Sequence, residues 1–182
     1  MSTIAVVLAP VLTSCDSSDS ATPPPFTPST APTSASSTPP SPQSEAGAEA
    51  QAAYRRYLQA KMATEASGGV NTKPLSSVAT GVILASELNQ ATIFRARKWH
   101  SVGQIDVVWT KVLKVGPTGP TGMIGEVTVQ ACFDSSKVTA VDANGKSVKK
   151  PGTPTRWLDE MRMRLEAGAW KASYGLNKAA KC

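Results

Sequence analysis

Few side chains of this 182-residue chain are suited to acid–base or nucleophilic chemistry. The chain holds a single histidine, His100, which excludes a histidine-rich metal site and any catalytic set that needs two histidines. Asp106 and the three tyrosines remain as groups for proton transfer, but Asp106 lies at the start of a strand-like run, where solvated aspartates are common. The glycine-rich stretch 116–122 lacks the Lys-Ser/Thr pair of a phosphate-binding loop. We therefore expect a surface or capping His100, no catalytic residue, no metal ligand and no cofactor.

Cys15 ends an apolar segment near the start of the chain. Residues 4–12 are nine uncharged residues, too few to span a bilayer as a helix but typical of the core of a secretory signal. The sequence LTSC at 12–15 resembles the bacterial lipobox, although the usual basic residues before the apolar run are missing. That resemblance implies a signal peptide over 1–14, lipidation of Cys15, and anchoring at the outer face of the cytoplasmic membrane. The alternative, a short buried strand ending in cysteine, is opposed by the polar tract that follows.

Residues 15–44 have the strongly biased composition of a tether. Of the 29 residues after the cysteine, 8 are proline and 14 are serine or threonine, and Phe26 is the only large apolar side chain. Such a segment buries too little apolar surface to offset the entropy of ordering it, so we expect a disordered, extended linker with a reach of about 90 Å. The net charge also changes along the chain: residues 1–50 carry −4 and residues 51–182 carry +10.

Three helical segments are expected after the tether. Ser44 is suited to cap a helix that runs through an alanine-rich stretch to the glycine pair at 68–69. Pro74 suits the first turn of a second helix, which Gly81 interrupts. A third helical piece is expected from 84 to 97.

After His100 the apolar residues recur with the period of two that strands show. Strands are expected over 105–115, 125–133, 138–141, 155–166 and 170–176. The Asn144-Gly145 pair predicts a tight hairpin after the third of them. Helices followed by hairpin-linked strands predict an α+β fold, in which N-terminal helices pack on one face of a curved antiparallel sheet.

Several short strings carry a resemblance to a known superfamily. They are Ala53-Tyr54 with Tyr57, the strand 127–134, the turn 168–171 (GAWK), and Tyr174-Gly175 before Cys182. With the order of the elements, they resemble the nuclear-transport-factor-2-like superfamily, and more narrowly small actinobacterial lipoproteins that carry such a domain behind a Pro/Ser/Thr-rich tether. The resemblance covers 45–182 and implies a single cone-shaped α+β roll domain over those residues.

Cys132 and Cys182 remain once Cys15 is assigned to the lipid. In the similar lipoproteins a cysteine in the middle of the sheet occurs together with one at the C-terminus, so the resemblance implies a disulfide between these two. An even pair of cysteines in an oxidising compartment agrees with that pairing. The alternative is a buried free thiol at 132 and a loose thiol in the tail.

Six basic residues of the domain are candidates for a surface that binds an anionic partner. Three lie at one helix end and three at mostly even spacing along one strand: Arg95, Arg97 and Lys98, then Arg156, Arg162 and Arg164. For an exported protein we expect no nucleic acid, and the candidate partners are an envelope protein, an anionic lipid or glycan, and an apolar small ligand. The alternative is a solvated basic face with no specific partner.

Together these features predict a membrane-anchored envelope lipoprotein whose roll domain binds a partner or an amphipathic ligand without catalysis. Two alternatives stay open. A phage- or mobile-element-encoded lipoprotein, acting in superinfection exclusion or transfer, would share the anchor and the compact domain. An enzyme of the isomerase or cyclase type would use the interior of the cone, and a buried Asp or Tyr pair in a pocket would identify it.

Overall fold

The structure is a computed structural model that describes residues 39–182, and Thr38–Cys182 form one compact unit. The predicted signal peptide, Cys15 and most of the predicted tether lie outside the described residues. Among the described helices, none combines the length and the hydropathy that a membrane crossing requires.

The first helix, α1 (Pro42–Ala66), begins earlier than the sequence predicts. Its N-cap is Ser41, whose hydroxyl accepts a hydrogen bond of 3.2 Å from the amide of Ser44. Pro42 takes the first helical position, where a missing N–H leaves no hydrogen bond unmade. The prediction of Ser44 as the cap is therefore wrong. Both serines suit a cap, but only Ser41 is followed directly by a proline that fits the first turn.

Two shorter helices follow, α2 (Lys73–Val78) and α3 (Gly81–Arg97). The predicted break between them is confirmed, and its cause is a contact with a strand. The amide of Thr80 donates a hydrogen bond of 2.9 Å to the carbonyl of Ala172, so the chain cannot continue as one helix there. Gly81 then starts α3 with a φ of +55°, a conformation that favours glycine, three residues earlier than expected.

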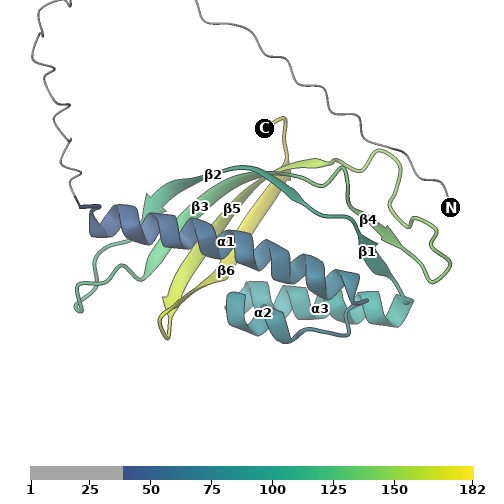
Figure 1. Cartoon of the computed structure of the whole chain (residues 1–182), viewed down its shortest axis with the longest axis horizontal. Coiled ribbons are helices and arrows are strands. Elements are labelled where there is room, and N and C mark those ends of the chain that lie inside the picture. Colours follow the sequence, from purple (N-terminus) through teal and green to yellow (C-terminus); the bar gives the residue numbers. More distant parts are fainter. Residues whose placement is uncertain (1–38) are drawn as a thin grey trace, which may run out of the picture. The chain divides into compact units, whose positions relative to one another are not determined.

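Four strands form an antiparallel sheet in the order β2-β3-β5-β6 (Figure 1). They are β2 (Asp106–Val115), β3 (Glu126–Asp134), β5 (Arg156–Glu166) and β6 (Ala169–Ala179). Each begins within one residue of its expected start, because alternation of apolar and polar residues marks a half-buried strand clearly. β6 runs three residues beyond its expected end.

A second, two-stranded sheet joins β1 (His100–Val102) to β4 (Thr139–Val141). The sequence predicts β4 but not β1, because three residues are too few to show a period. The amide of Asp142 donates a hydrogen bond of 2.9 Å to the carbonyl of Lys146, which closes the predicted turn around Gly145. This turn follows β4 directly.

The four-stranded sheet has an inner face, which the helices cover, and an outer face on the opposite side. Figure 1 shows α1 running across the sheet. Inner-face side chains such as Val127, Val129 and Met163 are 0% exposed and belong to one core with α1. Gly47 lets α1 lie close to β2, because a Cβ at that position would come within 2.9 Å of Cγ2 of Val112. The predicted α+β fold, with helices packed on one face of an antiparallel sheet, is confirmed.

Candidate functional site

A carboxylate and a phenol meet inside the roll. β5 places Asp159 on the inner face, two residues from the buried Met161, and α1 supplies Tyr54. The hydroxyl of Tyr54 donates a hydrogen bond of 2.9 Å to Oδ2 of Asp159. Tyr54 is 0% exposed and Asp159 is 5% exposed. The pair therefore joins the long helix to the sheet within the core.

Burial controls the protonation of this pair. Loss of water raises the pKa of Asp159 to about 6, although the hydrogen bond from Tyr54 and the charge of Lys61 both lower it. Burial also raises the pKa of Tyr54 far above its usual range, and the negative charge of Asp159 raises it further. At neutral pH the pair is thus a neutral phenol that donates to a carboxylate of increased proton affinity.

A second polar cluster connects α1, α3 and β1. The hydroxyl of Tyr57 and the ammonium of Lys61 donate to the two oxygens of Glu87, each at 2.6 Å. Lys61 also forms an ion pair of 3.2 Å with Glu65, which accepts a hydrogen bond of 2.9 Å from the hydroxyl of Ser101. Each ionisable side chain of this cluster has a partner within it, as buried charges require.

The charges of this cluster stabilise one another. Burial favours loss of the proton from Lys61, but the carboxylates of Glu65 and Glu87 outweigh burial and raise the pKa of the lysine. Burial and the charge of Glu87 raise the pKa of Tyr57 well above its usual range. The cluster therefore offers neither a free base nor a free acid near neutral pH. No group of three or more His, Cys, Asp or Glu side chains within residues 39–182 is placed to hold a metal ion.

A cavity of about 490 Å³ lies between the helices, the small sheet and the start of β5. Its lining includes three aromatic and three charged side chains: Phe94, Trp99, Trp157, Glu65, Lys149 and Lys150. Glu65 belongs both to this lining and to the buried cluster around Lys61. Asp159 is not part of the lining, whereas Trp157, the neighbouring inner-face residue of β5, is. The cavity is thus apolar in its aromatic walls and charged at a few points.

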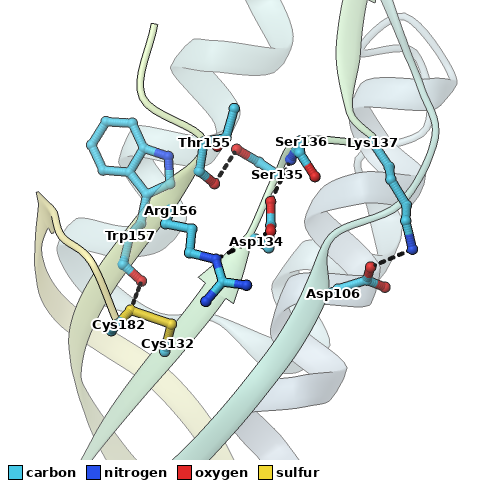
Figure 2. Close-up of polar contacts among 10 residues, drawn as sticks. All are labelled: Asp106, Cys132, Asp134, Ser135, Ser136, Lys137, Thr155, Arg156, Trp157 and Cys182. Atoms are coloured by element: carbon cyan, nitrogen blue, oxygen red, sulfur yellow. Dashed lines mark hydrogen bonds and ion pairs between the residues drawn. A yellow bond between two sulfur atoms is a disulfide. The ribbon is translucent and has the colours of Figure 1, made fainter.

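Asp106 and His100, which the sequence singled out, lie apart from the buried pair. Asp106 begins β2, and its side chain is 55% exposed and forms an ion pair of 2.7 Å with Lys137 (Figure 2). It borders another cavity of about 610 Å³, which lies beside α1 and does not include Asp159. His100 is half-buried in β1, opposite Val141. The expectation of a solvated Asp106 is confirmed.

Cys132 and Cys182 form the disulfide that the resemblance implied (Figure 2). Their Cα atoms are 5.8 Å apart, and the bond joins β3 to the segment that follows β6. Cys132 is 0% exposed, and Sγ of Cys182 lies 3.5 Å from the carbonyl oxygen of Trp157. The bond therefore fastens the last described segment to the middle of the sheet.

The six candidate basic residues divide among three parts of the surface: Arg95, Arg97 and Lys98; Arg162 and Arg164; and Arg156. The first three lie at the C-terminal end of α3, whereas Arg162 and Arg164 border a cavity with Gly81, which begins α3. α3 has 17 residues, so its ends lie about 25 Å apart. Arg156 forms an ion pair of 3.3 Å with Asp134 at the other end of β5 (Figure 2). The structure does not join the six into one patch.

The sequence did not single out the buried acidic residues. One signal was available for Asp159, because it occupies an inner-face position of β5 between Trp157 and Met161 in a strand of period two. A carboxylate in phase with apolar residues indicates a buried polar contact. Lys61 and Glu87 carry no such signal, because they are 26 positions apart and on different helices.

Comparison with known proteins identifies structural neighbours. No protein-family model and no curated protein matches this chain. The intermembrane-space region of chloroplast protein ARC6 aligns with a TM-score of 0.51 at 13% identity, over 74% of this chain and 97% of that one. Aln2 from a Streptomyces species aligns at 0.43 and 14% identity, over 77% and 93%. Kfla4162 from Kribbella flavida aligns at 0.44 and 15% identity, over 75% and 93%.

These likenesses concern the fold. At 13% identity, the similarity to the ARC6 region shows a shared chain arrangement and nothing about function. The TM-scores of the other two neighbours are below 0.5. The chain places its helices first and then an antiparallel sheet that curves beside α1 (Figure 1). The chain has the α+β roll fold that the resemblance implied.

Proposed function

We propose that the chain is an exported lipoprotein, anchored at the outer face of the cytoplasmic membrane through Cys15, whose roll domain binds a ligand without catalysis. The observation that carries the binding role is the cavity beside Trp157. Its volume of about 490 Å³ falls within the range of small-molecule sites, and its walls are aromatic. A non-catalytic role is supported by the buried cluster at its edge, where each ionisable side chain is already engaged by another.

The lining of the cavity suits an amphipathic ligand with negative charge. The rings of Trp99 and Trp157 offer flat apolar surface, and Lys149 and Lys150 add cations to the loop side. The one carboxylate of the lining, Glu65, forms an ion pair with Lys61, which shares its charge with Glu87. The two lysines of the lining exceed the one negative charge that this cluster retains. The charge that remains for a ligand is therefore positive.

Export is supported by the disulfide as well as by the sequence LTSC. Disulfides persist in oxidising compartments and are rare in the reducing cytosol. Cys132 and Cys182 are bonded, and Cys132 is fully buried, so the bond is part of the sheet's structure. A lipid on Cys15 and a disulfide in the domain both require the outer side of the membrane.

Ligand binding can be measured with anilinonaphthalene sulfonate, an amphipathic anion that fluoresces in apolar sites. We expect saturable binding by the wild type and a loss of affinity of about fivefold in the variant Lys149→Gln/Lys150→Gln. Lys146→Gln is the matched control, because Lys146 is an exposed lysine of the same loop region outside the cavity lining. Binding that does not saturate, or an equal loss in the control, would contradict the proposal.

The enzyme alternative has one observation in its favour. Asp159 is a buried carboxyl group with a pKa of about 6, bonded to Tyr54, and such a group can act as a general base near neutral pH. The test is the isomerisation of a β,γ-unsaturated steroid ketone to its conjugated isomer, followed by absorbance. Turnover by the wild type that Asp159→Asn abolishes would support the enzyme, and an inactive wild type would count against it.

A further inference from the structure

The outer face of the four-stranded sheet carries basic side chains in rows with apolar ones. The strand register places Lys114, Thr128, Arg162 and Tyr174 side by side across β2, β3, β5 and β6. The next row is Lys111, Gln130, Glu160 and Leu176. These residues lie opposite the inner-face residues that pack on the helices, because alternate side chains of a strand point to opposite faces. No helix among residues 39–182 covers this face.

The charge of the outer face is positive. Counted by the strand register, seven cations and five carboxylates lie on this face and give a net charge of +2: Lys111, Lys114, Arg156, Arg162, Arg164, Lys171 and Lys178, against Asp106, Glu126, Asp134, Glu160 and Glu166. Glu126 is engaged by Arg162 at 3.6 Å, and Glu160 accepts a hydrogen bond of 2.9 Å from Gln130. Asp134 is engaged by Arg156, and Asp106 by Lys137. The remaining five cations take part in none of the ion pairs found within residues 39–182: Lys111, Lys114, Arg164, Lys171 and Lys178. Their charges remain available to a partner.

Exposed apolar and aromatic groups lie among these cations. Leu176 is 62% exposed, Tyr174 is 44% exposed, and Leu113, beside Lys114 at a bulge of β2, is 49% exposed. The guanidinium of Arg162 lies 5.5 Å from the ring centroid of Tyr174. Cations interleaved with tyrosine and leucine are the composition that binds the headgroup region of an anionic bilayer.

We propose that the outer face docks on anionic phospholipid headgroups of the membrane that holds the anchor. A second copy of the chain is disfavoured, because two faces of net charge +2 would repel each other. A bilayer supplies many mobile negative charges, so it can match cations such as Lys111, Lys114 and Arg164 that lack a fixed partner. This inference rests on the proposed anchoring, since a lipid on Cys15 keeps the face at high concentration near that membrane.

The test uses the chain from Asp16 onward, which retains the whole compact unit and lacks both the apolar run and Cys15. Co-sedimentation is measured with vesicles of phosphatidylcholine alone, and of phosphatidylcholine mixed equally with phosphatidylglycerol. We expect binding to the mixed vesicles only, and release by salt. The variant Lys111→Gln/Lys114→Gln/Arg164→Gln should lose about a hundredfold in affinity, at about fivefold per cation.

The matched control removes three exposed cations elsewhere: Lys73→Gln, Arg95→Gln and Lys146→Gln. It should keep its affinity within a few-fold. Equal losses in both triple variants, equal binding to neutral vesicles, or no binding by the wild type would overturn the inference. So would a dimer in sedimentation equilibrium that only the outer-face variant dissociates, because the face would then be an interface between copies.

The outcome is separable from the proposed anchoring. If lipidated wild type fractionates with membranes while the chain from Asp16 does not bind anionic vesicles, the anchoring stands and the docking inference fails. If the chain from Asp16 binds anionic vesicles while the wild type takes up no labelled fatty acid in cells, the docking stands and the anchor fails.

Discussion

At the scale of single residues, Asp159 illustrates the cost of burying one carboxyl group. Its pKa is about 6 in the folded chain, against 3.8 for an ordinary aspartate. Below about pH 4 the group is protonated in both folded and unfolded states, and its contribution to stability is fully present. As the pH rises through 6, the unfolded chain has already lost the proton and the folded chain must ionise a buried group. That contribution to stability is therefore lost between these two values.

We expect Asp159→Asn to remove this pH dependence. Relative to the variant, the free energy of unfolding of the wild type should fall by about 3 kcal/mol between pH 4 and pH 7, because each pKa unit is worth about 1.4 kcal/mol. Urea denaturation of both proteins across that range measures the difference. Tyr54→Phe should enlarge the fall, since it removes a hydrogen bond that lowers the pKa of Asp159. Parallel profiles for wild type and Asp159→Asn would show that the carboxyl is not perturbed.

The two buried polar contacts, Tyr54–Asp159 and Tyr57–Glu87, also show what the sequence alone could not predict. Tyr54 and Tyr57 were recognised as titratable, but their partners Asp159 and Glu87 lie 105 and 30 positions away. Residue type and local spacing contain no information on such contacts, which form only when α1 packs on the sheet and on α3. The exposure of Asp106, by contrast, could be predicted from its position at the start of a strand. There an aspartate is solvated and needs no more than an exposed ion pair.

At the scale of elements, the strands of the large sheet were predictable and the ends of the helices less so. Alternation over nine to eleven residues fixes β3 and β5 almost to the residue. α1 was placed three residues late because Ser41 and Ser44 are both good caps. β1 depends on pairing with β4, some 40 residues on, and has no local pattern that could reveal it.

The disulfide reinforces the end of β6, which already pairs with β5 along its length. The bond between Cys132 and Cys182 closes a loop with a sequence separation of 50, so the chain-entropy model gives a stabilisation of about 4 kcal/mol. We expect Cys182→Ser to lower the free energy of unfolding by about that amount. Amide exchange should become faster at the end of β6, from Leu176 to Ala179, than the loss of global stability alone explains. Equal unfolding midpoints with and without a reductant would contradict this role.

At the scale of the whole molecule, the chain separates into parts of opposite character. The compact unit, Thr38–Cys182, carries a net charge of +8, and the residues before it carry −2. The proposed anchor therefore lies on the acidic side of this division, and the faces available to partners lie on the basic side. A basic domain beside an anionic membrane is attracted to it over about a Debye length.

The proposed anchor predicts where the protein is found. Cys15→Ala should move the protein out of the membrane fraction, because the thiol of Cys15 is the only proposed attachment point for the acyl chains. Each buried methylene of such a chain contributes about 0.8 kcal/mol to membrane binding. Fractionation with metabolic labelling by a fatty acid measures both the shift and the lipid. Ser18→Ala is the matched control, since it changes a polar side chain close to Cys15 that takes no lipid. Labelling of the wild type that persists in Cys15→Ala would refute the assignment.

If the chain is exported as proposed, the position of the disulfide sets an order of events. In a chain that crosses the membrane from its amino end, Cys132 emerges 50 residues before Cys182. β4, β5 and β6 must all have passed before the two sulfurs can meet. Until then Cys132 is a reactive thiol on an unfinished sheet, open to capture by an oxidant or by another chain. We therefore expect the bond between Cys132 and Cys182 to form late, after the sheet is complete.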